Sequence, residues 1–111
     1  MDDRSTILRV RSQIRSVNRR LAMGNVAPCN ADRALWGELA VVSFASVTGL
    51  GEDVRSDPET VLSDLLADLM HWCDARETRT CVSGPVDYES ALERAREHYS
   101  KERATEPQRA K

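Results

Sequence analysis

The segment from Ser56 to Ala75 carries the strongest structural signal in the chain. Apolar residues recur there at spacings of three and four, which is the repeat of one face of an α-helix. The row consists of Leu62, Leu65, Leu66, Leu69 and Cys73, and Val61, Met70 and Trp72 widen it. Such a face has to be buried against other elements. The segment therefore predicts a helix over residues 57–75 and a fold in which further helices pack on it.

Local chemistry specifies where this helix starts. Ser56 is followed three residues later by Glu59, which matches a capping box, in which each side chain accepts a hydrogen bond from the other residue's backbone N–H. Pro58 suits the first turn, because its missing N–H would have no helical partner there. The pattern predicts Ser56 as the N-cap.

Residues 5–22 predict a first helix with a heptad-like seam. The seam residues are Ile7, Val10, Ile14, Val17 and Leu21. Spacings of three and four over this length suit packing against a neighbouring helix, or against a second copy of the chain. A homodimer through the seam of residues 7–21 is therefore one expectation.

Two further segments also have helical patterns. Residues 31–48 are apolar nearly all round, which indicates a helix buried on several sides. A strand over residues 41–47 is the alternative, because several residues there are β-branched. Residues 87–103 predict a last helix, with Asp87 as its N-cap. The segment between residues 49 and 56 is polar and predicts a loop.

These patterns together predict an all-α fold, a single small bundle-like domain of about four helices over residues 1–103. The helices of residues 31–48 and 57–75 are expected to form its core. Residues 104–111 are polar and are expected to form a disordered tail.

The amino-acid composition limits which classes of protein the chain can belong to. With 41% hydrophobic and 31% charged residues, the chain resembles soluble globular proteins. No apolar run reaches the roughly 18 residues that a membrane span needs, and the N-terminus lacks a signal-peptide pattern. We therefore expect a cytoplasmic protein with no membrane partner. The 3 cysteines form no C-x-x-C pair and predict no disulfide framework.

Charge is distributed unevenly along the chain. Residues 1–23 hold six arginines against two aspartates, whereas residues 52–74 hold seven acids against one arginine. One end is therefore basic and the middle is acidic. The two segments are complementary, so pairing between them is one expectation.

Asp64, Asp68 and His71 project from one helix face, and carboxylates with imidazole suit a divalent metal. The alternative is a solvated polar face opposite the apolar row. Nucleotide pyrophosphohydrolases of the MazG type bind magnesium through acids spaced by three, whereas Asp64 and Asp68 are spaced by four. We therefore expect no catalytic residue, no metal site and no cofactor, with a metal-dependent nucleotide hydrolase as the alternative.

The arginines of the first helix suggest a second kind of site. They are Arg4, Arg9, Arg11, Arg15 and Arg20. Guanidinium groups bind phosphate, so a nucleic-acid-binding regulator acting through this helix is an alternative function. The competing interpretation is that these arginines solvate the helix or pair with acidic residues of the same chain.

The motif D-L-L-A-D-L-M-H-W-C-D of residues 64–74, followed by A-L-E-R-A-R-E-H-Y of residues 91–99, resembles a family of small helical proteins. They are encoded on bacterial phages, plasmids and integrative elements, and no established activity can be transferred from them. The resemblance implies a mobile-element accessory protein. By analogy with such proteins, it implies binding to a host protein or nucleoprotein defence complex, such as a CRISPR effector.

The leading expectation is a non-catalytic protein-interaction module that inhibits its host partner. Its contact surface would be the acidic side of the helix of residues 57–75. That surface comprises Asp57, Asp64, Asp68, His71 and Asp74. Charge complementarity would direct it to a basic, nucleic-acid-binding site on the partner.

Overall fold

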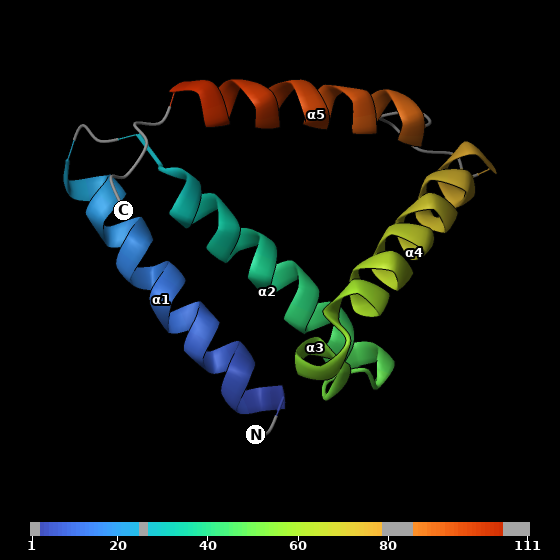
Figure 1. The fold of residues 1–111 in the computed structure, drawn as a ribbon, viewed down its shortest axis with the longest axis horizontal. Helices are drawn as coiled ribbons and strands as arrows, with labels where there is room; N and C mark the ends of the chain where they lie inside the picture. Colours follow the sequence, from blue (N-terminus) through green and yellow to red (C-terminus); the bar gives the residue numbers. More distant parts are fainter. Residues whose placement is uncertain (1–2, 25–26, 79–85, 106–111) are drawn as a thin grey trace. The chain divides into compact units, whose positions relative to one another are not determined.

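The computed structural model describes residues 3–24, 27–78 and 86–105, and these residues form five helices without a strand. The helices are α1 (Asp3–Met23), α2 (Asn30–Thr48), α3 (Asp53–Ser56), α4 (Pro58–Thr78) and α5 (Tyr88–Thr105) (Figure 1). The predicted all-α fold of about four helices is confirmed, since the four long helices match the predicted segments closely. The strand alternative for residues 41–47 is wrong, because they lie inside α2.

The chain divides into two compact units, residues 1–63 and 64–111, with the boundary inside α4. The first unit contains α1, α2, α3 and the start of α4. The second contains the remainder of α4 and α5. α5 continues to Thr105, and the rest of the predicted tail, residues 106–111, lies outside the described residues.

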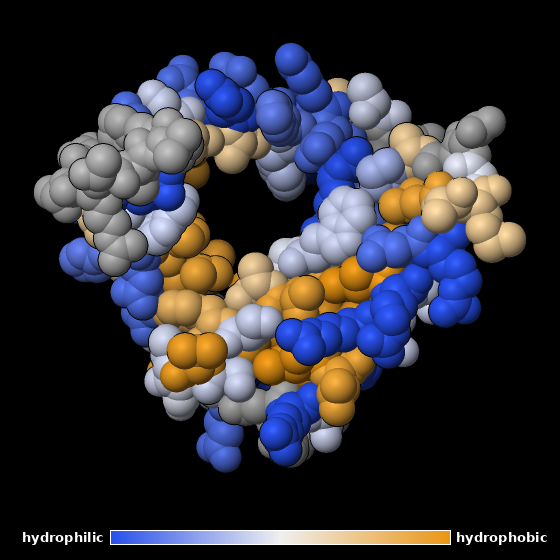
Figure 2. Space-filling view, turned by 180° about the vertical axis from the view of Figure 1, so that it is seen from behind, coloured by the Kyte–Doolittle hydropathy of each residue, from blue (hydrophilic) through white to orange (hydrophobic). Residues whose placement is uncertain are grey.

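In the first unit, α1 and α2 lie side by side in antiparallel directions (Figure 1). The predicted seam of α1 faces α2 of the same chain: Val10 is fully buried and the other seam residues are half-buried. Val42 and Ala45 supply the buried positions on α2. Figure 2 shows apolar side chains, in orange, gathered between the two helices, with hydrophilic side chains along α1. The intrachain alternative for the seam is therefore the one observed.

An ion pair between the half-exposed Arg20 and the buried Asp32 joins the two helices near their connection. Arg20 Nη2 donates to both carboxylate oxygens of Asp32 at 2.7 Å, and Asp32 is only 5% exposed. The backbone N–H of Cys29, the N-cap of α2, donates to Asp32 Oδ2 at 3.0 Å. Hydrogen bonds from Arg20 and then from Cys29 hold the pKa of Asp32 below its ordinary value. One carboxylate therefore caps α2 and fastens α1 to it.

Gly49 ends α2 in the left-handed conformation, with φ 80°, and its N–H donates to the carbonyl oxygen of Ala45. This backbone conformation suits glycine, which has no Cβ to clash with the neighbouring carbonyl. The short helix α3 follows within the segment expected to be a loop. Its four residues are too few to show a hydrophobic period, so periodicity could not predict it.

The start of α4 differs from the prediction. Asp57 is the N-cap: its Oδ1 accepts from the N–H of Thr60 at 3.3 Å, and its Oδ2 accepts from the Thr60 hydroxyl at 2.7 Å. The hydroxyl of Ser56 instead donates to the carbonyl oxygen of Glu52, inside α3. The predicted capping box of Ser56 is therefore wrong, because α3 already uses that residue. Pro58 occupies the first helical position as expected.

Burial of the apolar residues varies along α4 and α2. Val61 and Cys73 are buried, but Leu62, Leu66 and Leu69 are 46%, 38% and 40% exposed. On α2, Trp36 and Val47 are likewise exposed. Within the first unit, the extended helix packing joins α2 to α1. Periodicity shows which face of a helix is apolar, but it does not show which element covers that face.

We expect Asp32→Asn to lower the melting temperature at neutral pH, because the substitution removes the charge that Arg20 and the Cys29 N–H stabilise. The depressed pKa makes this stabilisation present above the ordinary pKa of aspartate, about 4, and lost as pH falls through the depressed value. Melting curves by circular dichroism should therefore show a deficit at about pH 7 that shrinks towards about pH 2.

The matched control is Asp64→Asn, which removes an exposed carboxylate and should leave the melting temperature at neutral pH unchanged. A deficit in Asp32→Asn that is equally large at acidic pH would show that the ion pair is not the cause.

Two glycine substitutions should have opposite effects on the free energy of unfolding. Gly37→Ala, inside α2, meets nothing within 4 Å and should stabilise by roughly 0.5–1 kcal/mol through helix propensity. Gly49→Ala also has open space, but its positive φ should cost roughly 1–2 kcal/mol. Urea unfolding measures both. A gain in stability for Gly49→Ala would contradict the left-handed cap.

Candidate interaction surface

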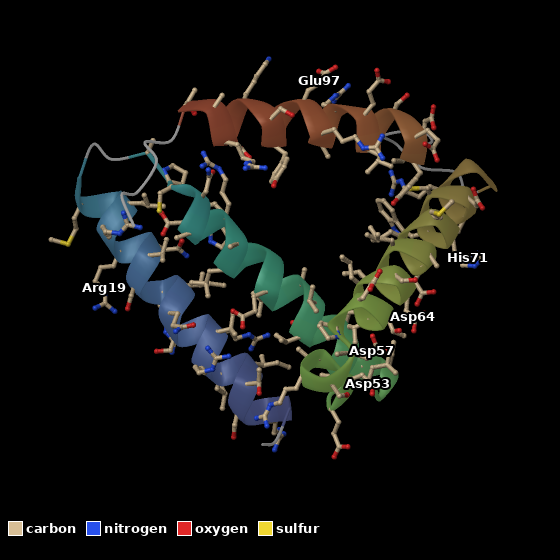
Figure 3. The ribbon with its side chains drawn as sticks, viewed as in Figure 1. Arg19, Asp53, Asp57, Asp64, His71 and Glu97 are labelled. Atoms are coloured by element: carbon tan, nitrogen blue, oxygen red, sulfur yellow. The ribbon has the colours of Figure 1, made fainter. Side chains whose placement is uncertain are left out.

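Three polar side chains share one exposed face of α4 in the second unit. Asp64, Asp68 and His71 follow one another at spacings of four and three, which places them on one side of the helix. Figure 3 shows Asp64 and His71 pointing from the same side of α4. All three are exposed. Within the described residues, neither carboxylate has a hydrogen bond or an ion pair. We call this set, Asp64, Asp68 and His71, the acidic face.

The two other acids predicted for the contact surface, Asp57 and Asp74, do not belong to the acidic face. Asp57 belongs to the first unit, and both of its carboxylate oxygens serve the α4 N-cap. Asp74 is exposed, and it lies at the edge of the acidic face, three residues after His71. The carboxylate of Asp57 is therefore engaged as a helix cap, whereas Asp64, Asp68 and Asp74 cap no helix.

Trp72 adjoins the acidic face and was predicted only as part of the apolar side of the helix. It follows Asp68 by four residues and is 52% exposed. The guanidinium of Arg76 lies over its ring, 5.1 Å from the ring centroid. Cation–π stacking of this kind restricts the indole while leaving part of it accessible. Tryptophan and arginine are enriched among the residues that dominate binding energy at protein interfaces, which is the signal that sequence analysis could have used.

The structure separates the five predicted arginines into two groups. Arg9 points towards α2, where its Nη2 lies 3.4 Å from Glu38 Oε1, and Arg20 is bound to Asp32. These two arginines therefore serve the α1–α2 contact. They differ in this respect from the arginines on the other flank of α1.

Arg4, Arg11 and Arg15 lie on the opposite flank of α1 from Arg9 and Arg20, together with Arg19, which the predicted set omitted. Figure 3 shows Arg19 pointing from α1 away from α2. Arg11, Arg15 and Arg19 are exposed and have no ion pair within the described residues. Their spacing of four gives an axial step of about 6 Å, so they form a linear row. We call Arg11, Arg15 and Arg19 the arginine row.

The first unit also has a hollow of about 590 Å³ between α1, α2 and the segment that contains α3. Its lining includes Arg9 and Arg55 against Glu38 and Glu52, so its charged groups balance. The lining of the hollow therefore has no excess of positive or negative charge that would attract a phosphate or a cation. In the part of the chain that the structure describes, no three histidine, cysteine, aspartate or glutamate side chains come together as a metal site.

Comparisons of the chain with protein-family models, with curated proteins and with solved structures found no match. None of the described helices combines the length and the apolar character needed to cross a lipid bilayer. The acidic face, Trp72 and the arginine row are therefore the features of the molecule that bear on its function.

Proposed function

We propose that the chain is a non-catalytic protein-interaction module that binds a positively charged surface of a host protein or nucleoprotein complex. The contact is made by the acidic face of α4. The resemblance of residues 64–74 to mobile-element proteins adds a biological context, in which the module inhibits a host defence complex. A CRISPR effector is one complex of this type, since it carries basic channels for nucleic acid.

The observation that carries the proposal is that, within the described residues, the carboxylates of Asp64 and Asp68 make no hydrogen bond and no ion pair. Three other acids have structural uses: Asp32 binds Arg20, and Asp57 and Asp87 cap helices. Asp64 and Asp68 keep their charge exposed beside a half-exposed tryptophan. An aromatic anchor flanked by unneutralised charge is a frequent composition of a protein-binding surface.

Charge complementarity explains how such a surface would compete with nucleic acid. A basic groove that binds phosphates attracts carboxylates by the same long-range field, which accelerates association. Exposed charges are screened within about 8–10 Å at physiological salt, so the attraction should weaken as salt rises. Trp72 would supply contact area that salt does not screen.

The test is charge reversal on the acidic face. We expect Asp64→Lys with Asp68→Lys to abolish capture of the partner from host lysate, because both exposed carboxylates become cations. Tagged protein is incubated with lysate with and without nuclease, and bound proteins are identified by mass spectrometry. A stoichiometric protein that survives nuclease and is absent with the double variant is the expected result.

The matched control is Glu93→Lys with Glu97→Lys on α5. It has the same spacing, the same change of charge and exposed positions, and Figure 3 shows Glu97 on α5. This control should capture the same protein as the wild type. Equal capture by the acidic-face variant, with helical content preserved by circular dichroism, would refute the proposal.

The arginine row favours a second candidate function, binding of nucleic acid phosphates. Its three guanidinium groups project from a helix face that carries no acid between residues 4 and 23. Replacing Arg11, Arg15 and Arg19 with Gln should weaken binding to a fluorescent duplex. It should also reduce the slope of log K against log salt by about 0.9 for each phosphate that an arginine no longer neutralises.

The control for this second function is Arg94→Gln, Arg96→Gln and Lys101→Gln on α5, which removes the same charge from another helix. An unchanged salt slope in the arginine-row variant, or an equal reduction in the control, would exclude the row as the phosphate-binding group. In the lysate experiment, partners that disappear with nuclease would favour this function over the first.

A further inference from the structure

The inference concerns the arginine row of α1, and it rests on the second candidate function, the binding of nucleic acid phosphates. Arg11, Arg15 and Arg19 belong to one helix of the first unit. All three side chains are exposed, and Figure 3 shows Arg19 pointing away from α2. The spacing within the row is therefore a property of α1 by itself.

The step along the row matches the step between the phosphates of one nucleic acid strand. Residues four apart in an α-helix are separated by about 6 Å along the axis and by about 40° around it, so the row covers about 12 Å within an arc of about 80°. One strand of a DNA duplex rises about 3.4 Å for each phosphate, and its phosphates lie about 6–7 Å apart because the strand winds around the axis. Each arginine of the row can therefore meet one of three successive phosphates.

We propose that the arginine row binds three successive phosphates on one strand of a nucleic acid duplex, whatever the base sequence. The uncharged side chains within the arc of the row are those of Leu8 and Ala22, which are exposed and have no hydrogen-bonding group. Contacts with phosphates position a protein on a duplex, whereas contacts with base edges provide sequence specificity. The row supplies the first kind of contact and lacks neighbours for the second.

A duplex suits the row better than a single strand. Base pairing and stacking already hold the phosphates of a duplex at a regular spacing, whereas a single strand loses conformational freedom when it is bound. Proteins that bind single strands combine a basic groove with aromatic side chains on which the bases stack, and α1 contains no Phe, Tyr or Trp. A single strand would therefore gain only the neutralisation of its charge.

Fluorescence anisotropy of the full chain with methylphosphonate duplexes tests the contact, because a methylphosphonate linkage carries no charge. In an interrupted duplex, every third linkage of both strands is neutral, so no three successive phosphates remain charged. In a grouped duplex, the same number of neutral linkages stands together at one end. At about 50 mM salt, the interrupted duplex should bind about tenfold more weakly than the grouped one, because one of three counterion-releasing contacts is lost.

The variant Arg15→Gln makes the test specific for the row. It keeps the two outer arginines, which can span a neutral linkage, so interruption should no longer weaken binding. The control Arg94→Gln on α5 removes the same charge and should respond to interruption as the wild type does. Circular dichroism verifies the helical content of both variants.

Four results would each overturn the inference while leaving phosphate binding by the row in place. They are equal binding of the wild type to both modified duplexes, a loss on interruption that persists in Arg15→Gln, tighter binding to a single strand than to the duplex, and a preference for one base sequence over a scrambled one. Absence of binding by the wild type to any duplex at low salt would instead refute the second candidate function, and the inference with it.

Discussion

The ion pair between Arg20 and Asp32 is the interaction on which the first unit depends. A buried carboxylate is costly unless charge and hydrogen bonds compensate it, and Asp32 receives both from Arg20 and the Cys29 N–H. One donor lies near the end of α1 and the other at the start of α2, so the carboxylate joins the two helices at this end. The closed hairpin brings Val10 against the buried positions of α2.

Ion pairs of this kind divide the charged side chains into those held by contacts within the chain and those that stay exposed. Arg9 and Arg20 turn towards acids on α2, so the arginines on the other side of α1 are the ones that face solvent. The segment rich in acids is sorted in a similar way, since Asp57 is held as a cap while Asp64 and Asp68 stay exposed. A count of charges along the sequence cannot make this distinction, because it depends on which partner each side chain reaches.

α4 has two sides of different chemistry. Asp64, Asp68 and His71 lie on one side, and Leu66, Leu69 and Cys73 lie on the other side of the same helix. The seam of α1, which was one candidate for a homodimer contact, faces α2 of the same chain.

The sequence by itself determined the helices. The 3,4 spacing, Pro58, Gly49 and Asp87 are local signals, and local hydrogen bonding alone decides where such helices start and end. Tertiary structure decided the rest, because a residue's partner depends on contacts far apart in the chain. It assigned the seam of α1 to α2, and it drew Arg9 and Arg20 to acids of α2. It also decided which charges are neutralised, and with them the candidate site.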